Sequence, residues 1–140
     1  MSILTNLSLT FAAGAVGGLL NSLLVWYFGL QGINQWLGVQ LAPTLTPAFL
    51  YPRLVWGGIW GWLFLLPWGT GFRWRQGLIF SLAPTLVQLL YVFPYRLQKG
   101  LLGWDLGMLT PVLVIFFNAV WGLGTAFWLG LTIRVGGRSN

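Results

Sequence analysis

Four apolar segments, each about twenty residues long, constrain this chain more than any other feature. They cover about residues 8–28, 48–68, 76–94 and 111–131. A helix of that length crosses a hydrocarbon core of about 30 Å. Charged residues make up only 6% of the 140 residues, whereas a soluble domain has about 25%, so little is left for a watery surface. We therefore predict one all-α domain, an integral membrane protein built as an antiparallel bundle of four transmembrane helices.

The few charges favour lipid as a partner. Seven basic residues and one acid, Asp105, give a net charge of +6. The basic residues lie between the apolar segments, where they anchor helices and meet anionic headgroups. A nucleic-acid-binding protein would instead gather them on a wetted face. We expect membrane lipid to be a partner and nucleic acid not to be one.

Side chains that carry out catalysis are scarce. The chain has no cysteine and no histidine, so disulfides, thiolate chemistry and the usual zinc sites are excluded for the chain acting alone. A single acid also excludes a mechanism based on paired carboxylates. We expect no enzymatic activity, no cofactor and no metal.

Small residues recur every four positions within the apolar segments, twice as a GxxxG motif. Such residues let two helix backbones approach closely. The pattern predicts contact with a helix of the same bundle or of another subunit, and it does not identify the partner. The residues expected at these contacts are Gly14, Gly18, Gly57, Gly61, Gly122 and Ala126.

Three amide side chains, Asn21, Gln88 and Asn118, fall within the predicted spans. An amide facing lipid is costly, so each is expected to face the bundle and find a partner. They could form a shared polar site for a substrate or an ion. Plain hydrogen bonding between helices is the simpler interpretation, and we favour it.

Arg53 stands near the start of the second segment, directly after Pro52. Proline suits the first turn of a helix, which would place Arg53 at a helix N-terminus, where a cation opposes the helix dipole. A lipid phosphate or an acidic partner would offset that charge. An ordinary interfacial anchor and a pair with Asp105 are the alternatives. If the helix begins instead at Pro47 after a Thr46 cap, Pro52 would kink it.

Three tryptophans, Trp56, Trp60 and Trp121, lie deep within the predicted spans. They could line a pocket for a flat hydrophobic ligand, although contact with lipid or with another subunit also explains them.

In the third segment Pro84 should bend the helix, and the hydroxyl group of Ser81 or Thr85 should donate a hydrogen bond to the carbonyl groups that the bend leaves free.

The loops suggest an orientation. The first loop, about residues 29–50, carries no charge and is expected to lie partly in the membrane interface. Thr110 is expected to cap the fourth helix, and residues 132–140 to form a short basic polar tail.

No signal peptide is expected at the N-terminus. Counting basic residues places both termini in the cytoplasm, most simply for a bacterial inner membrane, although a thylakoid membrane fits the same features.

Three functions are compatible with this sequence. The absence of recognisable chemistry and the GxxxG motifs favour a non-catalytic accessory or assembly subunit of a larger membrane complex. In architecture the chain resembles small dual-topology membrane proteins such as the small multidrug transporters and fluoride channels, which implies an oligomeric channel or transporter. It differs from the drug exporters because its first helix offers Asn21 where they depend on an acid. The third possibility is a protein that binds lipid or a hydrophobic ligand through Arg53 and the deep tryptophans.

Overall fold

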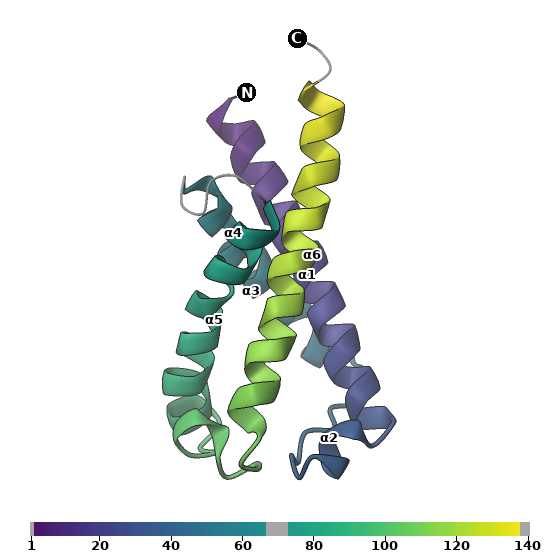
Figure 1. Ribbon diagram of the computed structural model, residues 1–140, viewed down its shortest axis with the longest axis vertical. Helices are drawn as coiled ribbons and strands as arrows, with labels where there is room; N and C mark the ends of the chain where they lie inside the picture. The colour runs from purple at the N-terminus through teal and green to yellow at the C-terminus, as the bar shows by residue number, and fades with distance from the viewer. Residues whose placement is uncertain (1, 67–72, 138–140) are drawn as a thin grey trace.

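The structure, a computed structural model, describes residues 2–66 and 73–137. All regular secondary structure in those residues is helical (Figure 1), which confirms the all-α prediction. Three helical stretches are long and apolar enough to span a membrane, as expected of an integral membrane protein. They are Ile3–Leu30, Arg73–Arg96 and Thr110–Thr132.

The first helix, α1 (Ile3–Leu30), is longer than the predicted span at both ends. It begins after Ser2, whose hydroxyl oxygen accepts a hydrogen bond from the backbone N–H of Thr5 at 3.1 Å. A serine in this position satisfies an N–H group that the first turn leaves open. The cap therefore moves the start of the helix ahead of the most apolar residues.

The second segment begins at an earlier residue than expected, because the preferred interpretation placed Pro52 in its first turn. Helix α3 (Pro47–Gly61) starts after Thr46, whose hydroxyl accepts from the N–H of Phe49 at 3.2 Å. Pro52 therefore lies inside the helix, and the prediction that it occupies the first turn is wrong. The 3₁₀ helix η1 (Trp62–Leu65) continues α3. The rest of the predicted span, 67–68, lies outside the described residues.

The third segment is a helix in three parts. They are α4 (Arg73–Phe80), α5 (Leu82–Val87) and the π-helix η2 (Gln88–Arg96). The break falls at Ser81, three residues before Pro84, as expected for a proline that lacks an N–H group. The Thr85 hydroxyl donates to the Ser81 carbonyl at 2.7 Å. The π-helix was not predicted, because apolar spacing over nine residues does not distinguish it from an α-helix.

The fourth helix, α6 (Thr110–Gly137), extends beyond the predicted end at residue 131. The first part of the expected polar tail is thus helical, and residues 138–140 lie outside the described residues. Thr110 is the first residue of the helix, but its buried hydroxyl has no hydrogen-bond partner. The prediction that its side chain caps α6 is therefore wrong.

Two long loops, residues 31–46 and 97–109, lie at the end of the molecule opposite the N-terminus of α1 (Figure 1). The first contains the single-turn helix α2 (Ile33–Trp36), and the second contains the 3₁₀ turn η3 (Leu101–Gly103). The backbone N–H of Gln40 donates to the carbonyl of Leu106 at 2.8 Å and joins the two loops. The helices that run between the loops must therefore cross the molecule and return.

Neighbouring helices pack antiparallel. Along α1, Thr10 lies beside Gly61 of α3, and Gly18, two turns later, lies beside Arg53. The same reversal of order relates α1 to α6. It also relates the third segment to α6, because Gly77 lies beside Gly122 and Thr85, two turns later, is bonded to Asn118.

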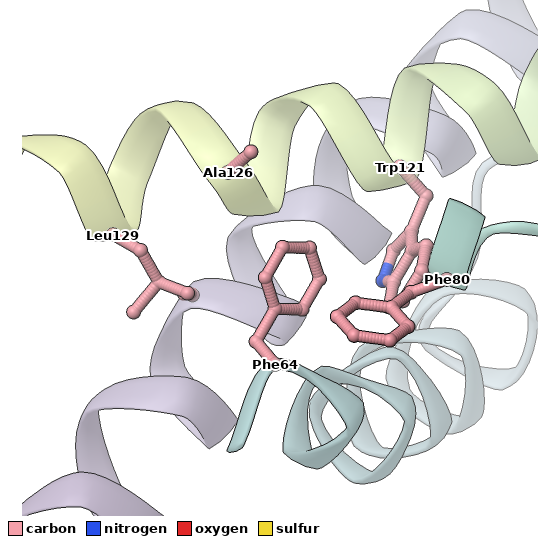
Figure 2. Close-up of a cluster of buried hydrophobic side chains, with 6 residues drawn as sticks. Phe64, Phe80, Trp121, Ala126 and Leu129 are labelled. Atoms are coloured by element: carbon pink, nitrogen blue, oxygen red, sulfur yellow. The ribbon is translucent and has the colours of Figure 1, made fainter. Parts of the chain in front are cut away.

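A buried cluster holds η1, α4 and α6 together. In Figure 2 the side chains of Phe64, Phe80, Trp121 and Leu129 point toward one another, and Ala126 of α6 belongs to the same cluster. The Phe64 ring meets the Phe80 ring edge-on, with centroids 5.0 Å apart, an arrangement that aromatic pairs favour.

Candidate binding groove

A groove of about 430 Å³ lies between α3 on one side and α5 with η2 on the other, with α1 and α6 at its back. This volume is in the range of pockets that hold small molecules. Residues on both walls are exposed, including Trp56 (56%), Val87 (40%) and Tyr91 (55%). The groove therefore opens to the side of the bundle.

The α3 wall is a single stripe of Arg53, Trp56 and Trp60. Residues three and seven positions apart lie on one face of a helix, so this arrangement follows directly from the spacing. Trp121 of α6 joins them at the back of the groove, where its indole N–H donates to the carbonyl of Gly14 at 3.1 Å. The three deep tryptophans singled out in the sequence thus line one site.

The opposite wall depends on the π-helix. Gln88, Val92 and Arg96 of η2 recur every four residues and all line the groove. The wider winding of a π-helix, with i→i+5 hydrogen bonds, keeps residues at this spacing closer to one line than an α-helix does. Arg96 was not among the predicted site residues, because it lies beyond the predicted span 76–94, whereas η2 extends the helix to it.

The three amides meet at the back of the groove. Asn21 of α1 donates to the Phe117 carbonyl at 2.7 Å and to the side-chain oxygen of Asn118 at 3.4 Å. Asn118 of α6 donates in turn to Thr85 at 3.0 Å and to Gln88 at 3.3 Å. Hydrogen bonds between side chains of different helices therefore connect α1, α6, α5 and η2.

Arg53 joins the same network from α3. Its Nε donates to the Ser22 hydroxyl at 2.9 Å and its Nη2 to the side-chain oxygen of Asn21. The guanidinium lies over the Phe49 ring, 4.8 Å from its centroid. Arg53 is half-buried in the second turn of α3, so its expected place at the helix N-terminus is wrong. Asp105, its proposed ion-pair partner, lies beside Gly100 in the second long loop.

Glycines form the closest contacts between the helices around the groove. Gly14 and Gly18 of α1 lie directly against Gly57 and Gly61 of α3, with backbone atoms in contact distance of any added Cβ. Elsewhere Gly122 of α6 lies against a glycine of α4, and Ala126 is buried in the cluster of Figure 2. Close packing at these two seams draws α3 toward α1 and α4 toward α6.

Gly17 is a contact residue that the sequence analysis missed. It packs against Trp121 and Thr125 of α6, on a different face of α1 from Gly14 and Gly18. One residue before Gly18, it belongs to a second small-residue face that includes Asn21, four positions later. That spacing was the available signal.

The chemistry of the groove is that of a binding site with one polar end. Guanidinium and amide groups donate hydrogen bonds, while the indole rings offer broad apolar faces. Within residues 2–66 and 73–137, no group of three histidine, cysteine or acidic side chains is placed to hold a metal ion. The arrangement suits a ligand with a polar head and an apolar body.

No protein-family model, no curated protein and no solved structure matches this chain.

Proposed function

We propose that this protein binds a lipid or another hydrophobic ligand within the membrane, in the groove between α3 and η2. The observation that carries the proposal is the groove itself, about 430 Å³ in volume and lined by Trp56, Trp60 and Trp121. Ligand pockets are usually concave, mostly apolar and provided with a few converging polar groups. An opening on the side of the bundle would admit a ligand directly from the bilayer.

We further propose that the chain crosses the membrane four times as an antiparallel bundle. Helix α3 has 15 residues and η1 adds four, so together they rise about 30 Å, the thickness of a hydrocarbon core. The bond from Gln40 to Leu106 supports this topology, because it keeps the loops before α3 and after η2 on one side. Both termini would then face the cytoplasm of a bacterial inner membrane.

Ligand binding is better supported than the role of an accessory subunit. That hypothesis rested on the absence of recognisable chemistry and on the GxxxG motifs, and the glycines Gly57 and Gly61 are covered by α1 of the same chain. The oligomeric channel needs a hydrated path, whereas Asn21 and Asn118 are buried and hydrogen-bonded to each other. Both hypotheses remain predictions, and each is an outcome of the experiment below.

A substitution that fills the groove tests the proposal. Val87 lines the groove, whereas the neighbouring Leu86 is exposed outside it. We expect native mass spectrometry of the protein, purified in mild detergent, to show a retained hydrophobic molecule in the wild type and in Leu86→Trp. Val87→Trp should lose it, because the indole would occupy its place.

Equal retention by both variants would show that the molecule binds elsewhere and would sink the proposal. Recovery with a large complex and no bound small molecule would favour the accessory subunit. A small homo-oligomer that conducts ions would favour the channel.

A further inference from the structure

The groove has a positive charge, and within the described residues no acid is paired with it. Arg53 and Arg96 both line it, and the chain has one acid, Asp105, which lies beside Gly100. A cation in apolar surroundings is costly unless an anion or a set of hydrogen bonds accompanies it. Hydrogen bonds accompany Arg53, but an anion that balances the charge of the groove would have to come from outside the described part of the chain.

Both arginines lie at the same end of the groove. Arg53 is in the second turn of α3, just after the first long loop, and Arg96 is the last residue of η2, just before the second. The two loops are bonded to each other. Trp56 and Trp60 lie three and seven residues further along α3, away from the loops. The groove is thus cationic at its loop end and apolar beyond it.

The guanidinium of Arg53 is held in one orientation, in which it can bind a ligand. Its bonds to Ser22 and Asn21 use Nε and Nη2 and fix the plane of the group. Within the described part of the chain its Nη1 has no hydrogen-bond partner. Arginine presents a planar fork that matches phosphate geometry, and a phosphate has enough oxygens to accept from two arginines together.

We propose that the occupant of the groove is a membrane phospholipid with a net negative headgroup. Its phosphate lies between Arg53 and Arg96, and an acyl chain runs along Trp56 and Trp60. This inference rests on the proposed function and adds the charge and class of the ligand. Charge complementarity selects it, because a zwitterionic lipid would bring its own cation to a site that already has two.

The test compares two phospholipids with identical acyl chains. Delipidated protein in detergent is titrated with phosphatidylglycerol or phosphatidylcholine, and bound lipid is counted by native mass spectrometry. We expect phosphatidylglycerol to bind up to about 25-fold more tightly, since two cations near a headgroup each contribute roughly five-fold. Sodium oleate is a third arm, which asks whether a carboxylate serves as well as a phosphate.

Arg96→Gln is the first variant, because Arg96 is exposed and its loss should not prevent folding. It should reduce the preference for phosphatidylglycerol about five-fold. Adding Arg53→Gln, which keeps a polar side chain at this position, should abolish the preference. Lys99→Gln is the matched control, since Lys99 is exposed, lies three residues away and does not line the groove. That variant should bind both lipids as the wild type does.

The outcomes separate this inference from the proposed function. Equal affinity of the wild type for both phospholipids, with binding still lost in Val87→Trp, would overturn the anionic ligand and leave the groove as a lipid site. Oleate binding more tightly than phosphatidylglycerol would overturn the phosphate. A preference reduced equally by Lys99→Gln would assign it to general surface charge. Absence of any bound lipid or other hydrophobic molecule would overturn both proposals together.

Discussion

Two fully buried threonines of α6 differ in what their hydroxyl groups do. The Thr125 hydroxyl donates to the Trp121 carbonyl at 2.8 Å, whereas the Thr110 hydroxyl has no partner. A buried polar group without a partner costs about 1–3 kcal/mol, and a made hydrogen bond contributes about 1 kcal/mol. We expect Thr110→Val to raise the free energy of unfolding by about 1 kcal/mol and Thr125→Val to lower it by a similar amount.

Thermal unfolding of the two variants in the same detergent checks this prediction, and each serves as the control for the other. Both substitutions preserve volume, so packing should change little. Destabilisation by Thr110→Val that equals or exceeds that by Thr125→Val would show that the Thr110 hydroxyl is bonded, for example to a buried water molecule.

At this same scale the sequence predicted which polar groups face inward but not how they combine. Asn21, Gln88 and Asn118 were expected to face the bundle because an amide in lipid is costly, and in the structure they are hydrogen-bonded there. The hydrogen-bond partners of Arg53 could not be predicted from the sequence. Ser22 is 31 residues away, and its contact with Arg53 depends on how far α3 extends and how closely it packs on α1.

Among the helices, the packing of α1 against α3 depends most on glycines, which have no side chain. A Cβ added at Gly57 would lie 2.8 Å from the Gly14 carbonyl oxygen and 3.1 Å from the Gly18 Cα, both backbone atoms that cannot move aside. At Gly130 an added Cβ would meet nothing within 4 Å. We expect Gly57→Ala to lower the free energy of unfolding by about 1–3 kcal/mol through overpacking.

Gly130→Ala is the matched control, and it should be neutral or stabilising by up to about 1 kcal/mol because alanine is the better helix former. Unfolding in detergent measures both variants. If Gly57→Ala left the isolated protein as stable as the wild type and only released a partner protein, the glycines would belong to an interface with another subunit.

The boundaries of the helices are the part of the fold that the sequence alone does not predict. Two proline signals compete at the start of α3, Thr46-Pro47 and Tyr51-Pro52, and either suits a first turn. The structure uses the earlier one, where the Thr46 side chain caps the helix. The π-helix from Gln88 to Arg96 has no local signal of this kind, so the wall of the groove that it forms could not be predicted.

At the scale of the whole molecule, the bundle is open on the side of the groove because the close contacts between helices are made elsewhere. Glycine seams join α1 to α3 and α4 to α6, while α3 and η2 face each other across the groove. Apolar packing between helices gains little inside lipid, so small residues and hydrogen bonds decide which helices meet. The sequence indicated four segments and their small faces, but the pairing of those faces required the three-dimensional arrangement.

The number of membrane crossings can be measured directly, because the natural chain has no cysteine and each new one is a single label site. Four crossings place Gln40 and Met108, one in each long loop, on the same face of the membrane, with Ser2 on the other. Gln40 and Met108 are both exposed, Met108 by 87%. Gln40→Cys and Met108→Cys should therefore react with a membrane-impermeant maleimide from one side of sealed vesicles, and Ser2→Cys from the opposite side. Three crossings, with α3 failing to span, would put Gln40 and Met108 on opposite faces, even though a hydrogen bond joins their two loops in the structure.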